Sequence, residues 1–480
     1  MFSSEELLAA TAGVVVGGAL PLIFPGAAID SRQVRPGELF VAIRGETTDG
    51  HRFIAAAIEH GAAAILCAQP DSKALEHGVP HIVVADPLAA LQEVARLRLA
   101  RQPETRVIAV AGSNGKTSVK EATAALLERL APTLRTTGNL NTETGVPVSL
   151  LRLLPEHRYA VIEMGAQRVG EVAALCRIAP PKVAVVTVVG PEHLEFFGGM
   201  AQVIQAEGEI VDALPPDGLA ILNADDADVH GMASRTQARI LTYGRAEGAD
   251  VRAVDVAGDT LTGLSFTLSY AGEQAQVRLH LPGAHAVSTA LAAAAVALSC
   301  GMPLEEIAVA LGELPPAKRR GEVKAGVNGC VLIDDSYNSN RQSALAALET
   351  LRGAQIPSGA QRWFVFGDML ELGDYSPAEH AAVGEALARS GIERAVLLGQ
   401  DTRHTYEAAL AAGMEPARIA YFLAPLDQPD DLARAKQEAA ALVGAEVASG
   451  DLVLVKGSLG VGMDSVVAAL TGAEATDSSH

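Results

Sequence analysis

Residues 107–120, VIAVAGSNGKTSVK, join a short apolar run to a glycine-rich turn and a helix-compatible stretch. Such a turn can hold phosphate, because glycines let backbone N–H groups approach the anion and a following helix N-terminus favours negative charge. The full pattern G-x-x-x-x-G-K-[ST] needs glycine where this chain has Val110, so the loop is a shortened variant. The alternative is a glycine-rich turn that happens to contain GKT. The apolar run before the loop and the helical stretch after it favour nucleotide binding.

Within this loop we expect Lys116 to bridge the outer phosphates of a nucleotide and Thr117 to bind Mg²⁺. The candidate nucleotide-binding residues are Gly112, Ser113, Asn114, Gly115, Lys116, Thr117 and Ser118.

Composition limits the classes of protein that this chain can be. At 480 residues it exceeds what one hydrophobic core usually organises, so two or three domains are expected. A formal net charge of -20 argues against nucleic acid or an anionic membrane as the main partner. The four cysteines stand singly, with no C-x-x-C, which fits reduced thiols in a cytoplasmic protein better than zinc or disulfides.

Residues 7–28 carry no charge, and a segment of that length raises the possibility of a membrane helix or signal peptide. Glu6 precedes it where a signal peptide has Lys or Arg, and Pro21 and Pro25 interrupt it. We therefore expect no membrane insertion. A helix capped by Ser3, with Glu6 three residues later, followed by a strand, is the preferred interpretation.

Apolar β-rich runs alternate with Ala/Leu/Glu-rich helical stretches through the middle of the chain, which predicts an α/β fold with a parallel sheet. Residues 250–282 alternate polar and apolar residues instead, which predicts a small antiparallel flap. LPPAKRRGE, from Leu314, indicates a hinge before a second strand–helix series. The predicted domains are 1–103, 104–314 and 315–480.

Two polar residues follow the strands expected after the loop. Glu163 ends the run YAVIE, and His193 lies in GPEHLEFFG after VAVVTVV. Sites in α/β folds lie at the carboxyl ends of strands, so both are candidates for metal or phosphate binding. The alternatives are a solvated strand end for Glu163 and a packing or capping histidine for His193.

Several further motifs support a resemblance. They are IDSRQVRPGELFVAIRGETTDGHRF (29–53), TGNLNTETGVPVSLL (137–151), EMGA (163–166), IDDSYNSN (333–340) and FGDMLELG (366–373). In order and spacing the chain resembles the Mur ligase family nearly end to end. Within it, EMGA and GDMLELG resemble the type that adds D-alanyl-D-alanine to UDP-N-acetylmuramoyl-tripeptide.

The resemblance implies a UDP-binding α/β domain, a central P-loop ATPase-like domain and a C-terminal Rossmann-like domain. It also implies an ATP- and Mg²⁺-dependent ligase of cytoplasmic peptidoglycan synthesis, in which the tripeptide carboxylate is phosphorylated and the resulting acyl phosphate is captured by the D-alanyl-D-alanine amine. Charge neutralisation is the physical requirement, since two anions must meet. We expect a monomer, and either lysine or diaminopimelate as the third peptide residue.

The resemblance also assigns roles to individual residues. Lys116, His193 and Lys456 are the candidate catalytic residues. Thr117, Glu163, His193 and Glu207 are the candidate metal ligands. On the nucleotide side it points to His285, Arg320 near the phosphates and Asp335 near the ribose. On the substrate side it points to Ser31 and Arg32 near the uridine diphosphate, and to Asn139, Thr142 and Asn338. The alternative is a turn-forming residue for Asn139 and Thr142, a solvated loop residue for Arg320, Asp335, Asn338 and Lys456, and a solvated helix glutamate for Glu207.

The chain departs from the family at four positions. Ala286 and Thr289 stand where the family has asparagines, Glu207 stands where it has a lysine that is carbamylated in several members, and Leu459 stands where it has arginine. A glutamate could supply the carboxylate directly, whereas leucine cannot imitate a guanidinium. These changes keep open a non-catalytic paralogue that binds a nucleotide sugar. A folylpolyglutamate synthase-like ligase is the other alternative, opposed by the N-terminal DSR…DGH segment.

Overall fold

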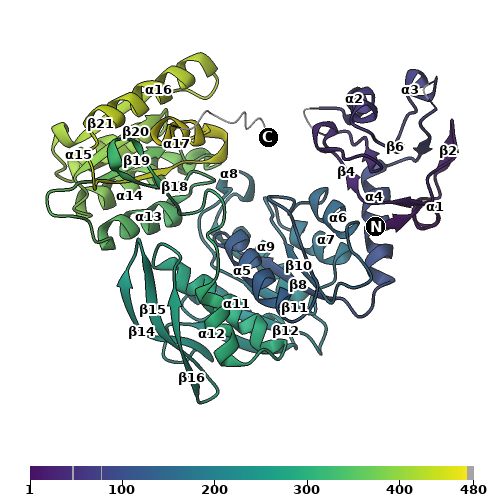
Figure 1. The fold of residues 1–480 in the computed structure, drawn as a ribbon, viewed down its shortest axis with the longest axis horizontal. Coiled ribbons are helices and arrows are strands. Elements are labelled where there is room, and N and C mark those ends of the chain that lie inside the picture. The colour runs from purple at the N-terminus through teal and green to yellow at the C-terminus, as the bar shows by residue number, and fades with distance from the viewer. Residues whose placement is uncertain (46–47, 77, 473–480) are drawn as a thin grey trace.

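The computed structural model describes residues 1–45, 48–76 and 78–472. Its three main sheets take their strands from residues 14–83, 106–279 and 322–456. Figure 1 shows the N-terminal unit in purple and the C-terminal unit in green to yellow, on opposite sides of a central blue to teal unit. The α/β fold in three units is confirmed, whereas the exact boundaries of the units stay predictions.

The N-terminal unit contains a five-stranded sheet in the order β2-β7-β6-β5-β4. Its elements are β1 (Phe2–Ser3), α1 (Ser4–Thr11), β2 (Val14–Val16), β3 (Ile23–Phe24), β4 (Ala27–Ala28), β5 (Leu39–Val41), α2 (Ile54–Glu59), β6 (Ala64–Cys67), α3 (Ser72–Glu76), β7 (His81–Val83) and α4 (Pro87–Ala100). The predicted capping box at Ser3 and Glu6 is present and starts α1. Within the described ranges, no helix combines the length and apolar character needed to cross a bilayer.

The central unit is a nine-stranded sheet in the order β16-β15-β14-β13-β12-β11-β8-β10-β9. Its elements are β8 (Arg106–Ala111), α5 (Lys116–Glu128), β9 (Thr133–Arg135), α6 (Gly145–Leu150), β10 (Tyr159–Glu163), α7 (Glu171–Ile178), β11 (Val183–Val186), α8 (Leu194–Phe197), α9 (Met200–Asp212), β12 (Leu219–Asn223), α10 (Ala227–Gly231), β13 (Arg239–Gly244), β14 (Val251–Asp259), β15 (Gly263–Tyr270), β16 (Glu273–Leu279), α11 (His285–Ser299) and α12 (Leu304–Gly312). Strands β8 to β14 pair in parallel, and β14, β15 and β16 pair antiparallel, so the predicted flap extends the main sheet.

The apolar run of β8 is buried on both faces of this sheet. Ile108 and Val110 belong to one hydrophobic cluster, while Val107, Ala109 and Ala111 belong to another. Side chains alternate between the two faces of a strand, so a strand covered on both sides must be continuously apolar. This explains why the sequence before the glycine loop contains no polar residue from position 107 to position 111.

The C-terminal unit is a six-stranded sheet in the order β17-β18-β22-β19-β20-β21, parallel except for the antiparallel pair β17–β18. Its elements are β17 (Glu322–Ala325), β18 (Val331–Asp335), α13 (Arg341–Gly353), β19 (Arg362–Gly367), α14 (Ser376–Arg389), β20 (Arg394–Gly399), α15 (Thr402–Ala411), β21 (Ile419–Leu423), α16 (Pro429–Glu446), β22 (Leu452–Lys456) and α17 (Asp464–Thr471).

The order of the central strands places the glycine loop at a switch point. β8 lies between β11 and β10, so the chain leaves it in one direction across the sheet for β9 and β10 and in the other for β11 and β12. Ligands of open α/β sheets bind at such a point, beyond the carboxyl ends of the strands. The loop, Glu163 at the end of β10 and the segment after β11 therefore share one edge of the sheet.

Candidate active site

The glycine loop is held in shape before any ligand binds. Gly112 has φ +124°, and a Cβ there would lie 2.1 Å from the Thr187 Oγ1 atom, so a larger residue does not fit. Thr187 Oγ1 donates to the Asn114 carbonyl (2.6 Å). Ser113 Oγ donates to the Gly190 carbonyl (3.0 Å) and accepts from the Gly190 N–H (2.9 Å). The segment 187–190, which follows β11, thus braces the loop.

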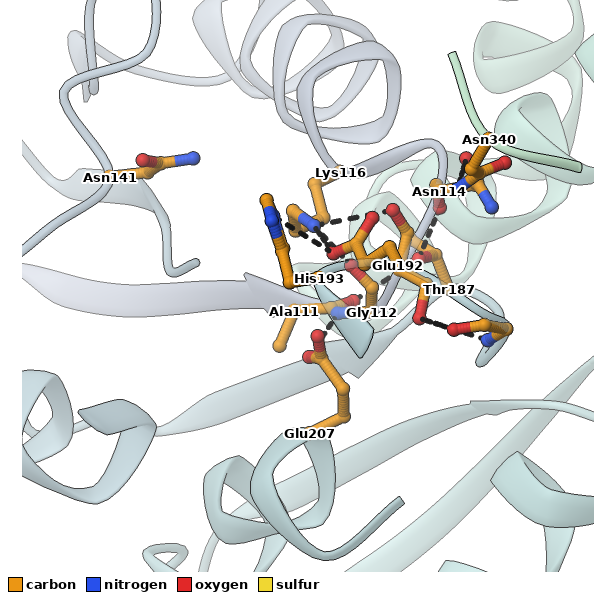
Figure 2. A network of polar contacts seen from close by, with 12 residues as sticks. Ala111, Gly112, Asn114, Lys116, Asn141, Thr187, Glu192, His193, Glu207 and Asn340 are labelled. Atoms are coloured by element: carbon orange, nitrogen blue, oxygen red, sulfur yellow. Dashed lines mark hydrogen bonds and ion pairs between the residues drawn. The ribbon is translucent and has the colours of Figure 1, made fainter. Parts of the chain in front are cut away.

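Lys116 lies within this loop as a preformed cation. Its Nζ donates to the Gly112 carbonyl (2.5 Å) and forms an ion pair with Glu192 Oε1 (2.8 Å), as Figure 2 shows. Burial lowers the pKa of Lys116, but the charges of Glu192 and Glu207 outweigh burial and leave that pKa above its usual value. The ammonium is therefore charged and can exchange a carboxylate for a phosphate oxygen. Sequence reasoning missed Glu192, although it stands beside His193 in a motif already selected.

Thr117 and Glu163 supply oxygen atoms next to the loop. Thr117 Oγ1 donates to Glu163 Oε1 (3.1 Å), and Asn141 Nδ2 donates to the same oxygen (2.9 Å). Glu163 Oε2 is buried and makes no hydrogen bond, with Lys120 Nζ 3.4 Å away. Mg²⁺ is held by one or two carboxylates together with substrate phosphates, so this oxygen set fits it. Sequence reasoning missed Asn141, which lies in the TGNLNTET motif.

Glu207 does not join these oxygens. Its side chain is fully buried, and Oε2 accepts from the Gly112 N–H (2.6 Å). Figure 2 shows it on the other side of Gly112 from Lys116 and His193. Glu207 is therefore a buried brace of the loop, and its predicted role as a metal ligand stays a prediction. In the described part of the chain, no group of three or more His, Cys, Asp or Glu side chains could hold a metal by itself.

His193 meets the C-terminal unit. It has φ +50°, at the N-terminus of α8, and its Nδ1 contacts the carboxylate of Glu371 from the loop after β19. Burial lowers the pKa of His193, but Glu371 and Glu192 outweigh it and raise the pKa above its usual value. The hydrogen bond from His193 lowers the pKa of Glu371. Sequence reasoning missed Glu371, although FGDMLELG was one of the selected motifs.

Lys456 and its partners form the C-terminal wall of the site. Lys456 is 2% exposed, and its Nζ donates to Asp335 Oδ2 (2.7 Å) and to the Asn338 carbonyl (2.9 Å). His285 lies at the start of α11, and burial lowers the pKa of its imidazole although Asp335 opposes that shift. These four predicted residues are brought together by two different units of the chain.

Further bridges link the C-terminal unit to the loop itself. Arg320 Nη2 donates to Thr117 Oγ1 (3.0 Å). Asn340 Nδ2 donates to Asn114 Oδ1 (2.9 Å), and Asn114 Nδ2 donates to Gln342 Oε1 (2.9 Å). α13 and its N-cap residue thus provide hydrogen-bond partners for both the oxygen and the nitrogen of the Asn114 amide. A polar side chain paired in this way fixes the orientation of the two units.

A cavity of about 950 Å³ unites these groups. The predicted residues that line it are Ser113, Asn114, Gly115, Lys116, Thr117, Ser118, Asn139, Thr142, Glu163, His193, His285, Arg320, Asp335, Asn338 and Lys456. Arg44 reaches it from the N-terminal unit. The predicted residues that do not line it are Gly112, Glu207, Ser31 and Arg32. Arg32 forms an ion pair with Asp30 (2.9 Å), and the predicted role of Ser31 and Arg32 at a uridine diphosphate stays a prediction.

The remaining departures from the family pattern lie at this cavity or next to it. Thr289 lines the cavity from α11, where Ala286 is also buried. Leu459 lines it too and is 38% exposed, so its side chain has room to be replaced by a longer one. None of these three substitutions removes a residue of the glycine loop.

Comparison with known proteins finds similarity along most of the chain. Three family models match: the Mur ligase family catalytic domain at residues 25–99, the Mur ligase middle domain at 110–297, and the Mur ligase glutamate ligase domain at 319–459. The chain is 37% identical to the UDP-N-acetylmuramoyl-tripeptide--D-alanyl-D-alanine ligase of Mycobacterium tuberculosis, covering 97% of this chain and 98% of that protein. It is 39% identical to the Escherichia coli ligase of the same name, covering 92% of each.

Solved structures match as well. The crystal structure of MurF from Acinetobacter baumannii superposes with a TM-score of 0.83 at 31% identity, over 97% of this chain and 98% of that one. MurF ligase from Thermotoga maritima in complex with ADP superposes with a TM-score of 0.75 at 27% identity, over 92% of this chain and 96% of that one.

Proposed function

This chain belongs to the Mur ligase family, and we propose that it joins D-alanyl-D-alanine to UDP-N-acetylmuramoyl-tripeptide at the expense of ATP. It is an ATP-dependent ligase that forms a C–N bond. The match over nearly the full chain, N-terminal unit included, favours this reaction over that of a folate ligase.

One observation carries the proposal: cations from all three units line a single cavity. Lys116 comes from the glycine loop, Arg320 and Lys456 come from the C-terminal unit, and Arg44 comes from the N-terminal unit. A carboxylate must approach a triphosphate, and the repulsion between these anions is a large part of the barrier. Fixed cations in a site that excludes water lower that barrier most effectively.

The proposed reaction has two steps. A tripeptide carboxylate oxygen attacks the γ-phosphorus of ATP, forming an acyl phosphate and releasing ADP. The dipeptide amine then attacks the acyl carbon, the amide forms, phosphate leaves, and the amine loses a proton. We assign Lys116 and Arg320 to the phosphate oxygens, because both lie at the glycine loop. Lys456, which donates to Asp335, lines the same cavity.

Thr117 and Glu163 are proposed to hold Mg²⁺, whose charge would neutralise the phosphates when it is bound. Glu163 Oε2, which is buried, makes no hydrogen bond and lies 3.4 Å from Lys120 Nζ, supports this assignment. We propose that His193 is the third protein group that binds this Mg²⁺. Ser31 and Arg32 are proposed to contact the uridine diphosphate, and Asn139 and Thr142 the peptide.

We also propose a cytoplasmic monomer. A reaction that consumes ATP and a UDP-linked substrate belongs in a compartment that holds nucleotides, and the net charge of -20 opposes association with nucleic acid.

Phosphate release tests the function directly. The assay contains ATP, Mg²⁺ and UDP-N-acetylmuramoyl-tripeptide, with and without D-alanyl-D-alanine, and is repeated with Lys116→Ala. Release that requires both substrates, and that falls about 100-fold or more in the variant, supports the proposal. Tripeptide binding without release would support the non-catalytic paralogue instead.

A further inference from the structure

We propose that Glu371 is a positioning residue: from the C-terminal unit, it fixes the ring of His193 so that the Nε2 atom faces the reaction site. The proposal rests on the proposed function for the role of His193. The structure shows the contact itself: Nδ1 of His193 contacts the Glu371 carboxylate, and the two residues are 178 positions apart in the sequence.

The loops that carry the two residues are docked on each other at more than one point. The Glu195 N–H donates to the Glu371 carbonyl (3.2 Å). Tyr375 Oη donates to the Gly198 carbonyl (3.2 Å). Segment 193–198 of the central unit and segment 371–375 of the C-terminal unit therefore meet in a defined register, with the His193–Glu371 contact at the cavity.

Glu371 is presented from a braced loop. The Met369 N–H donates to His380 Nε2 (3.0 Å), and the Leu370 N–H donates to Ser458 Oγ (3.0 Å). The Asp368 carboxylate accepts three backbone N–H groups, from residues 400–402. Because hydrogen bonds hold residues 368, 369 and 370, the loop can fix the position of the next side chain, that of Glu371.

The backbone at both ends of the contact is in an uncommon conformation. His193 has φ +50° and Glu371 has φ +62°, in the left-handed region that non-glycine residues seldom adopt. Such conformations persist where the surrounding structure over-determines them, and they cluster at functional sites. Here they bring the two side chains face to face.

The chemistry of imidazole gives this contact a consequence. A carboxylate can only accept, so Nδ1 of His193 is the donor and the lone pair of a neutral ring lies on Nε2. Nε2 lies 4.0 Å from Glu192 Oε1, the carboxylate that pairs with Lys116. A histidine oriented by a carboxylate on its other nitrogen is the usual arrangement of a metal-binding imidazole. In this chain the orienting carboxylate belongs to another unit, so His193 is aligned only when the two units are docked.

The test compares Glu371→Ala and Glu371→Gln with Tyr375→Phe in the full chain. The phenylalanine variant removes the other side-chain hydrogen bond between the loops without touching His193, so it controls for weaker docking. Two measurements do not depend on turnover: ¹⁵N NMR of the histidine ring nitrogens, and Mn²⁺ binding in the presence of ADP by electron paramagnetic resonance. The third is kcat and KM for ATP in the ligase assay.

We expect Glu371→Ala to shift the His193 Nδ1 resonance, to weaken Mn²⁺ binding by about 10-fold or more and to lower kcat by a similar factor with little change in KM. Glu371→Gln, which keeps an acceptor oxygen, should lie between the wild type and the alanine variant. Tyr375→Phe should stay within about twofold of the wild type in Mn²⁺ binding.

An unchanged Nδ1 resonance in Glu371→Ala, or equal losses of Mn²⁺ binding in Glu371→Ala and Tyr375→Phe, would overturn the positioning role. Wild-type protein that fails to turn over both substrates would instead refute the proposed function, while the NMR and Mn²⁺ comparisons still decide the role of Glu371.

Discussion

Replacing Glu207 by glutamine should stabilise the folded protein at pH 8 and should change its stability much less at pH 5. The carboxyl is fully buried beneath the glycine loop, with Oε2 accepting from the Gly112 N–H and Oε1 without a partner. Burial raises its pKa to about 7, and the nearby charge of Lys116 and the Gly112 N–H offset burial only in part. At pH 8 the protein therefore contains an ionised carboxylate in a site that favours the neutral acid.

The size of the effect follows from proton linkage. An unfolded glutamate titrates near 4.5, so between pH 4.5 and about 7 the folded state holds more protons than the unfolded state. The stability from this group is fully present below pH 4.5 and is lost as pH rises through about 7. The pKa shift of Glu207 corresponds to about 3 kcal/mol in the free energy of unfolding, of which about 2–3 kcal/mol is lost between pH 5 and 8. Glutamine, always neutral, avoids this loss.

Scanning calorimetry at pH 5 and pH 8 measures the difference. For a unit the size of the central one, the Glu207→Gln shift in unfolding temperature should be about 5–10 °C more positive at pH 8 than at pH 5. Glu209→Gln, on the same helix, is the matched control, since its two oxygens accept the Gly170 (2.6 Å) and Ala173 (3.0 Å) N–H groups. Glu209→Gln replaces one of these two acceptor oxygens by an NH₂ group, so this variant should be less stable than the wild type at both pH values. An equal Glu207→Gln shift at pH 5 and pH 8 would refute the reasoning.

Three other substitutions probe the cavity. Arg320→Lys keeps the charge but loses the guanidinium that bonds Thr117, so kcat/KM for ATP should fall about 10-fold, with unfolding temperature as the control. Leu459→Arg restores a guanidinium at the cavity and should lower KM for ATP about fivefold; a rise in KM would show that the leucine is required. Asn114→Ala removes the amide that donates to Gln342 and so weakens the docking of the central and C-terminal units. Small-angle X-ray scattering should then show a larger radius of gyration than that of the wild type, and kcat should fall about 3- to 10-fold. Unchanged scattering would contradict this docking role.

The sequence alone determined the parts of this protein that depend on neighbouring residues. The loop from Gly112 to Thr117 follows from an apolar strand, glycines and a helix start within a few positions, and the cap at Ser3 follows from a glutamate three residues on. The parallel sheet and its antiparallel flap follow from the change of hydrophobic period. These features were predictable because hydrogen bonding and side-chain direction within one element are set locally.

Tertiary structure decided which side chains meet. Lys116 pairs with Glu192, 76 residues away, and Asn114 bonds Gln342, 228 residues away. Glu207, which the family resemblance makes a candidate metal ligand, lies on α9 and accepts a hydrogen bond from the Gly112 N–H beneath the loop. No local period encodes such contacts, because they depend on how strands are ordered in a sheet and how separate units dock. The sequence thus supplied the groups for phosphate chemistry, and packing within the central unit and between units selected the partners that hold them in place.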